Sequence, residues 1–108
     1  MSFSEEVREI LHKNNEFDRS RVKVGDNCVS IGLDDNCLPC ICYGKIEKKC
    51  EDGTYTYYDR EFDIRILFRE KDVAECYPDT PKNRTIIKSA CEQVIAKWRE
   101  SVRKQFAK

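Results

Sequence analysis

The sequence predicts a mainly β domain that consists of a small five-stranded barrel, a short N-terminal helix and a long C-terminal helix. Between residues 22 and 77 the apolar residues fall in short alternating runs separated by acidic turns, which is the pattern of half-buried strands. Before and after this stretch, the apolar residues recur at helical spacing instead. The length of 108 residues is typical of one domain, which we expect to span residues 1–108.

The first helix is predicted over residues 3–14. Ser2 and Glu5 have the spacing of a capping box, in which each residue satisfies an unpaired amide of the first helical turn. The apolar residues that follow form one narrow stripe, which consists of Phe3, Val7, Ile10 and Leu11. Because only one stripe is apolar, we expect this helix to lie flat on the rest of the domain.

The middle of the chain is predicted to hold five strands, at residues 23–31, 37–48, 54–58, 64–68 and 74–77. Asp52-Gly53 favours a hairpin turn, and one helical turn is expected at residues 69–73. Gly44 lies in mid-strand, where it predicts a bulge or a sharp bend. Because five short strands cannot cover both faces of a flat sheet, we expect them to close into a barrel without exposed edges.

The second helix is predicted over residues 81–106, because Thr80 is a suitable N-cap and Pro81 suits the first helical position. Such a helix is about 39 Å long, whereas the radius of gyration of a domain this size is about 13 Å. Its apolar stripe continues almost to the end, so we expect the face formed by Trp98, Val102 and Phe106 to be covered. Either the first helix covers it, or a partner protein or a second copy does.

Composition excludes several classes of protein. Apolar residues make up 40% and charged residues 37% of the chain, which is typical of a soluble domain. No apolar run approaches the ~20 residues that span a bilayer, and the first residues lack the features of a secretory signal. Glycine-rich phosphate loops and nucleophile motifs are absent, and His12 is expected to be solvated, so we predict no catalytic residues and no enzyme activity.

The chain has seven cysteines, and because this number is odd they cannot all pair in disulfides within one chain. Cys28, Cys42 and Cys91 lie within apolar patterns, so we interpret the cysteines mainly as small buried hydrophobic residues in a reducing compartment. A zinc site or a redox role remains an alternative for the closely spaced group, which consists of Cys37, Cys40, Cys42 and Cys50. Zinc ligands usually come as two separated pairs, and a second pair is missing, so no metal or other cofactor is predicted.

The net charge of the chain is zero, but its charged residues are unevenly distributed along the sequence. Residues 1–80 carry 12 lysine and arginine residues against 18 acidic ones, whereas residues 81–108 carry 8 against 2. An acidic barrel attracts cationic peptides and a basic helix attracts nucleic acid, unless the two parts neutralise each other within the molecule. Candidate nucleic-acid contacts are Lys97, Arg99, Arg103 and Lys104 on the helix, with Lys48 and Lys49 at the rim of the barrel.

The stretch from 22 to 77 resembles the Tudor domains, whose relatives include the chromo-barrel, agenet and hybrid Tudor domains. Four segments carry the resemblance: the opening strand at 24–28, the acidic hairpin loop at 34–38, strand three at 55–59 and the helical turn at 70–73. The resemblance implies an SH3-like barrel and a chromatin-associated module that binds histone tails or other cationic, methylated peptides. It also implies a nuclear location.

The resemblance further implies a box of about four aromatic side chains around the cation. At the two earlier positions of the box this chain has Leu33 and Pro39, so the predicted box is incomplete. Tyr43 contributes a ring only if the register shifts. The candidate ligand-binding residues are Tyr58, Phe62, Asp59, Asp63 and Tyr43. We therefore predict a non-catalytic binding module, with a nucleic-acid-binding module and an adaptor or homodimer joined by the C-terminal helix as alternatives.

Overall fold

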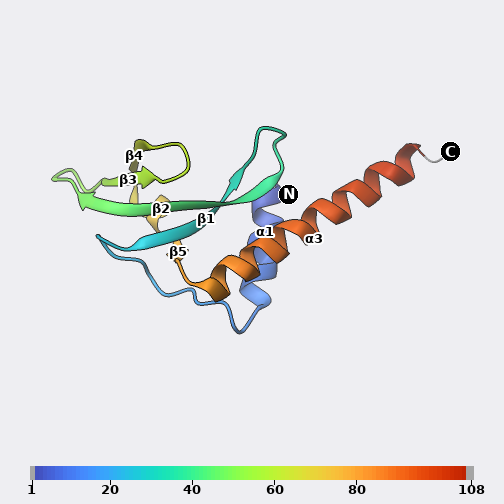
Figure 1. Cartoon of the computed structure of the whole chain (residues 1–108), viewed down its shortest axis with the longest axis horizontal. Coiled ribbons are helices and arrows are strands. Elements are labelled where there is room, and N and C mark those ends of the chain that lie inside the picture. Colours follow the sequence, from blue (N-terminus) through green and yellow to red (C-terminus); the bar gives the residue numbers. More distant parts are fainter. Residues whose placement is uncertain (1, 107–108) are drawn as a thin grey trace.

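The protein folds into one antiparallel sheet with two long helices beside it (Figure 1). The structure, a computed structural model, describes residues 2–106. Along the chain the elements are α1 (Phe3–Lys13), β1 (Asn27–Leu33), β2 (Pro39–Lys49), β3 (Tyr55–Asp59), β4 (Ile64–Phe68), α2 (Glu70–Val73), β5 (Tyr77–Pro78) and α3 (Pro81–Phe106). The C-terminal part of α3 projects from the sheet, and the molecule measures 58 × 29 × 22 Å. Within residues 2–106, no helix has both the length and the apolarity needed to cross a bilayer.

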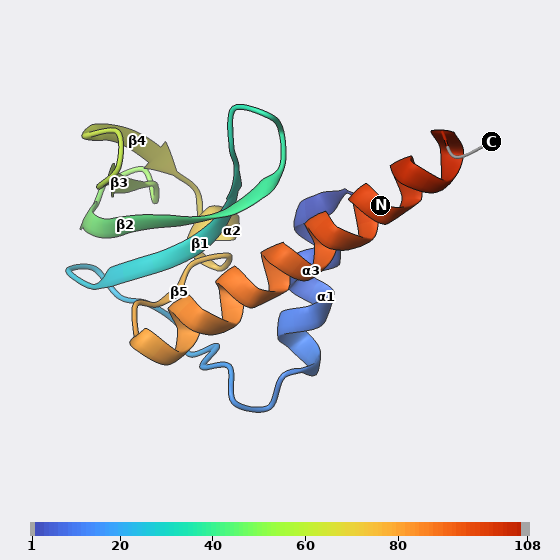
Figure 2. The same cartoon turned by 45° about the vertical axis from the view of Figure 1, so that its right-hand side comes forward.

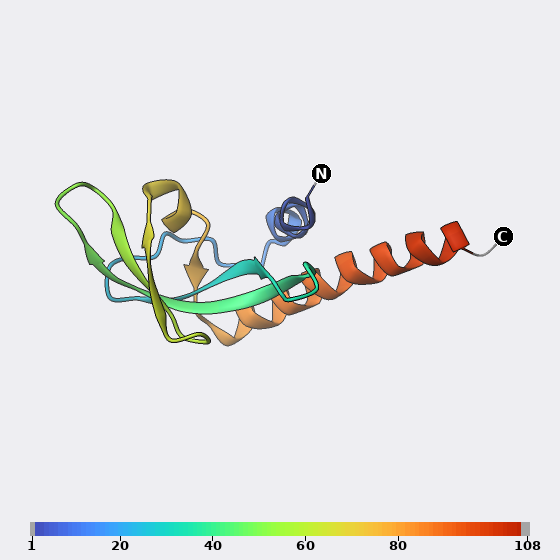
Figure 3. The same cartoon turned by 90° about the horizontal axis from the view of Figure 1, so that it is seen from above.

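The sheet has the strand order β4-β3-β2-β1-β5, and every neighbouring pair is antiparallel. β5 returns to pair with β1 over two residues, but it does not pair with β4. The sheet is strongly twisted, so that β4 runs across the direction of β1 and β2 (Figure 3). The predicted mainly β fold with a closed SH3-like barrel is therefore not confirmed, because the fold is mixed α and β and its five-stranded sheet is open.

Two helices explain why the sheet does not need to close. α1 and α3 lie beside each other and against β1 and β2 (Figure 2). Between the helices and these strands lies the first hydrophobic core, with Val7, Leu11, Phe17, Val29, Tyr77, Ile87, Ala90, Cys91 and Val94. The expectation of closure assumed that the strands had only each other for cover. Helices supply that cover on one face of the sheet instead.

A second hydrophobic core lies on the opposite face of β1. Its buried members are Val22, Cys28, Ile46, Tyr55, Tyr57, Val73 and Cys76. Cys28 belongs to this core and Val29 belongs to the first, and both side chains are 0% exposed. Because successive side chains of a strand point to opposite faces, β1 separates the two cores.

Both long helices begin at the residues that the sequence predicts. Ser2 Oγ accepts a hydrogen bond from Glu5 N at 3.2 Å, and Thr80 Oγ1 accepts one from Asn83 N at 3.0 Å. β1 begins four residues later than predicted, at Asn27. Gly25 explains the difference, because it has a φ of +96° in the turn before the strand and donates its amide to the carbonyl of Ile46.

Gly44 is not the site of a bulge in β2, which was one of the two features predicted there. The register with β3 shifts between Ile46 and Lys48 instead. A Cβ atom on Gly44 would overlap the ring of Tyr57, which stacks on Phe68 with a centroid distance of 4.1 Å. The glycine is therefore needed for the close approach of an aromatic ring.

We predict that Gly44→Ala lowers the free energy of unfolding by about 1–3 kcal/mol, because the new methyl group displaces the ring of Tyr57 from the second core. Urea denaturation followed by circular dichroism measures the change. In a Tyr57→Leu background the same substitution should cost much less, since the ring is gone. Equal costs in both backgrounds would show that the ring is not the reason for the glycine.

Candidate functional site

Two turns at one end of the sheet enclose a small pocket of about 220 Å³. One turn joins β1 to β2, and the other joins β3 to β4. The pocket is lined by Leu33, Asp34, Asp35, Cys40, Cys42, Glu61 and Phe62. The three carboxylates are on exposed residues, whereas the two cysteines are half-buried. The pocket therefore combines an apolar lining with a negative rim.

The β1–β2 turn is held by the side chain of Asp34. Its Oδ1 accepts hydrogen bonds from Asn36 N at 2.8 Å and from Leu38 N at 3.0 Å. Cys37 has a φ of +63° and completes the turn. These bonds fix the Asp34 carboxylate at the entrance to the pocket.

The β3–β4 turn places Phe62 at the pocket. Asp59 Oδ1 accepts hydrogen bonds from Glu61 N at 2.9 Å and from Phe62 N at 3.0 Å. The side chain of Phe62 is 67% exposed, and Asp63, with a φ of +53°, ends the turn. Asp59 thus acts within the backbone turn, where small side-chain oxygens commonly replace a backbone acceptor.

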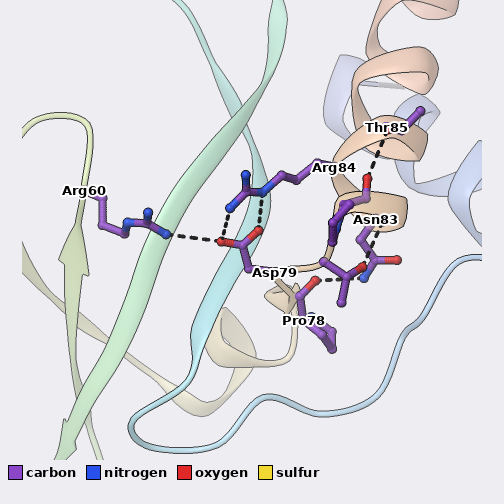
Figure 4. Close-up of polar contacts among 8 residues, drawn as sticks. Arg60, Pro78, Asp79, Asn83, Arg84 and Thr85 are labelled. Atoms are coloured by element: carbon purple, nitrogen blue, oxygen red, sulfur yellow. Dashed lines mark hydrogen bonds and ion pairs between the residues drawn. The ribbon is translucent and has the colours of Figure 1, made fainter.

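A buried carboxylate ties this turn to α3 (Figure 4). Asp79, whose side chain is 4% exposed, accepts from Arg84 Nε at 2.5 Å and Nη2 at 2.9 Å, and from Arg60 Nη1 at 3.2 Å. The hydrogen bonds from Arg84 are the main reason that the pKa of Asp79 lies below its ordinary value of 3.8. Arg60 comes directly before Glu61 in the chain, so this contact positions the side of the pocket formed by the β3–β4 turn.

Beside Asp79, the side chain of Asn83 joins α3 to the long segment between α1 and β1. Asn83 is 0% exposed, and its Nδ2 donates to the carbonyls of Asp18 and Pro78, each at 2.9 Å. Its Oδ1 accepts from Asp18 N at 2.9 Å. Both the nitrogen and the oxygen of this buried side-chain amide have hydrogen-bond partners within the chain, so the amide is not free to bind a ligand.

The predicted aromatic residues do not form one box. Tyr58 donates to Asp63 Oδ1, which raises the pKa of the tyrosine hydroxyl, and the guanidinium of Arg65 lies 4.9 Å from its ring centroid. Tyr43 likewise has the guanidinium of Arg84 at 5.3 Å. Neither tyrosine lines the pocket. Both rings therefore already have a cation from the same chain, and of the candidate residues Phe62 alone lines the pocket.

Several residues of the pocket were missed by the sequence analysis. The sequence identified Asp34 and Asp35 as an acidic loop but not as ligand-binding residues, it suggested Cys40 only as an alternative zinc or redox residue, and it did not point to Glu61. Of the two positions where the resemblance implies rings, one lies at this pocket and the other lies next to a lining residue. Leu33 lines it directly, whereas Pro39 is buried beside the lining residue Cys40.

The cysteines of the pocket, Cys40 and Cys42, are half-buried parts of its lining. Burial raises the pKa of the Cys42 thiol to about 12, and burial also raises that of Cys40. Cys37 is exposed on the turn, and Cys50 follows the opposite end of β2. In the part of the chain that the structure describes, no three histidine, cysteine or acidic residues are arranged to hold a metal ion.

The candidate nucleic-acid residues lie in two separate places. Lys48 and Lys49 end β2, whereas the C-terminal half of α3 projects at the other end of the molecule (Figure 1). On α3, the ammonium group of Lys97 lies 3.6 Å from the carboxylate of Glu6, and Arg103 lies 3.6 Å from Glu100. Arg99 and Lys104 are exposed on the same helix. The two basic groups therefore do not form one continuous surface.

α1 covers only part of the predicted partner face of α3. The rings of Phe3 and Trp98 meet edge to face with centroids 6.2 Å apart, which leaves Trp98 42% exposed. Val102 is half-buried, and Phe106 is 81% exposed. Contacts with α1 thus cover the apolar face of α3 only as far as about Trp98.

We predict that Asp79→Asn lowers the free energy of unfolding by about 1–3 kcal/mol, because two guanidinium groups lose their carboxylate. The folded-state pKa of Asp79 is lowered, so its contribution is complete above about pH 4 and is lost as the pH falls further. Urea denaturation at several pH values should therefore show the difference from wild type shrinking below that pH. Glu47→Gln, which breaks the exposed pair with Arg65, is the control and should cost less than about 1 kcal/mol.

Comparison with protein-family models, with curated proteins and with solved structures finds no match to this chain. The function is therefore inferred from the geometry of the pocket and from the surfaces around it.

Proposed function

We propose that this protein is a non-catalytic binding module that takes a cationic segment of another protein at the pocket between its two turns. The observation that carries the proposal is the set of three carboxylates around an apolar lining in a pocket of about 220 Å³. The strand order supports a relation to SH3-like barrels of the Tudor type, in an opened form. In this sheet four strands follow in sequence and the fifth returns to pair with the first.

A lysine or arginine side chain matches this pocket in two ways. Its charged end is attracted by Asp34, Asp35 and Glu61, and no lysine or arginine is among the described residues that line the pocket. Its aliphatic stem packs against apolar side chains such as Leu33 and Phe62. Arg60 comes directly before Glu61, but its guanidinium is held by Asp79 and does not line the pocket.

The pocket favours recognition of charge over recognition of methylation. One aromatic ring, that of Phe62, lines it where a full box has about four. Each favourable cation–ring contact contributes about 0.5–2 kcal/mol, so one ring gives little preference for a methylated cation. We therefore expect unmodified and methylated lysine peptides to bind with similar affinity.

A binding role also agrees with the chemistry of the lining groups. A thiol with a pKa of about 12, such as that of Cys42, is protonated at neutral pH and is a poor nucleophile. The carboxylates of the pocket belong to exposed residues, where water is free to solvate their charge. These features favour binding over catalysis, and from the Tudor resemblance alone we propose that the ligand is a histone tail and that the protein is nuclear.

We predict that Asp35→Asn combined with Glu61→Gln weakens binding of a lysine-rich histone-tail peptide about tenfold, since two of the three carboxylates are removed. Isothermal titration at two salt concentrations measures the affinity. The control is Glu16→Gln with Glu51→Gln, which removes the same charge from exposed positions outside the pocket. Phe62→Ala should weaken binding severalfold with little loss of stability, because the ring is largely exposed.

Three outcomes would contradict the proposal. Equal weakening by the pocket variant and by its control would mean that the peptide responds only to net charge. Undetectable peptide binding by the wild type would remove the proposed ligand class altogether. DNA binding that is steeply salt-dependent and is lost in Arg99→Ala with Arg103→Ala would favour the nucleic-acid alternative instead.

A further inference from the structure

β4 lies at the edge of the sheet and has a free side. It pairs with β3 alone, so one edge of Ile64–Phe68 has no strand partner within residues 2–106. α1 and α3 lie across the sheet from it and do not cover it (Figure 1, Figure 2). The amides and carbonyls along such an edge are a template for another strand.

This edge lacks the features that protect most exposed edges. The sequence of β4, Ile-Arg-Ile-Leu-Phe, contains no proline, and its register with β3 is regular. Three apolar side chains of β4 are notably exposed: Ile64 at 48%, Ile66 at 42% and Leu67 at 66%. The single charge of the strand, Arg65, is paired with Glu47 through a hydrogen bond of 2.8 Å. Ile64 and Ile66 share one face of the strand and Leu67 lies on the other, so both faces of this edge expose apolar surface, which is a common feature of sites of protein association.

We propose that this edge pairs antiparallel with β4 of a second copy of the chain, with the two-fold axis at Ile66. In that register Ile66 faces itself, Ile64 faces Phe68 of the second copy, and Arg65 faces Leu67 of the second copy. Asp63 and Arg69 flank the two ends of β4, so this pairing brings Asp63 of one copy to the end at which the second copy has Arg69. The pairing joins two five-stranded sheets into one and places opposite charges at both of its ends.

The other registers are less favourable. Directly opposed residues must share a face of the sheet, so a two-fold axis perpendicular to the sheet has to pass through a residue. An axis at Arg65 would place two arginines opposite each other, and an axis at Leu67 would place Arg65 opposite Arg69 of the second copy. Like charges directly opposite each other are destabilising. An axis at Ile64 leaves fewer paired residues, because Ile64 is the first residue of β4 and Asp63 before it has a φ of +53°.

The exposed part of α3 is a poorer surface for a second copy. Arg99, Arg103 and Lys104 lie beside its apolar residues, with Glu100 as their one acidic neighbour from residue 98 to 106. Two such helices would bring like charges together. The edge of β4 therefore suits a second copy better than the helix does.

Sedimentation velocity over roughly a hundredfold range of protein concentration tests the proposal, because dimerisation follows mass action. The wild type should form a reversible dimer. Ile66→Lys and Ile66→Glu should each raise its dissociation constant at least about tenfold, since like charges then meet at the axis. An equimolar mixture of these two variants should dimerise again. Phe106→Lys changes an exposed apolar residue of α3 and should leave the dimer unchanged.

Hydrogen exchange of the wild type gives a second readout that does not depend on the folding of any variant. The amides of residues 64–68 should become more protected as the concentration rises. A wild type that stays monomeric, or a dimer lost in Phe106→Lys but kept in Ile66→Lys, would overturn the proposal. It would also be overturned by a mixture of the two charged variants that stays monomeric, or by protection that does not change with concentration. Peptide binding at the pocket can fail or succeed independently of these results.

Discussion

The structure depends on the burial of β1 on both of its faces. Cys28 lies in the core shared with β3 and α2, and Val29 lies in the core shared with α1 and α3, with neither side chain exposed. A slip of one residue in the register of β1 would exchange these faces and disrupt both cores at once. α1 and α3 on one side and β3 and β4 on the other are therefore coupled through β1 and β2.

Polar contacts hold the turns in place relative to the sheet and its two cores. Asp79 receives hydrogen bonds from Arg60 and Arg84, and Asn83 joins α3 to the segment after α1. Both residues are almost fully buried and fully paired, so they hold one geometry and leave no free polar group. The β3–β4 turn is positioned by these contacts, and with it one side of the acidic pocket.

The two proposed interaction surfaces both involve the β3–β4 hairpin. Phe62 lines the pocket, and Ile64 begins the free edge two residues later. On the side of the sheet that carries α1 and α3, the apolar side chains of the strands pack against the helices in the first core. Both proposed surfaces thus lie away from α1 and α3, around the turn and the free edge of this hairpin.

The sequence by itself determined α1, α3 and β4 nearly to the residue, because N-caps, a proline and strict alternation are local signals that need no distant partner. Of the ligand-binding residues that the sequence predicted, Phe62 is the one that lines the pocket between the two turns. Only the tertiary structure decided whether the sheet closes, since that depends on helices packing on one face of β1 and β2. For the same reason it decided that Tyr58 and Tyr43 each lie beside an arginine instead of in the pocket, because those arginines come from other elements of the fold.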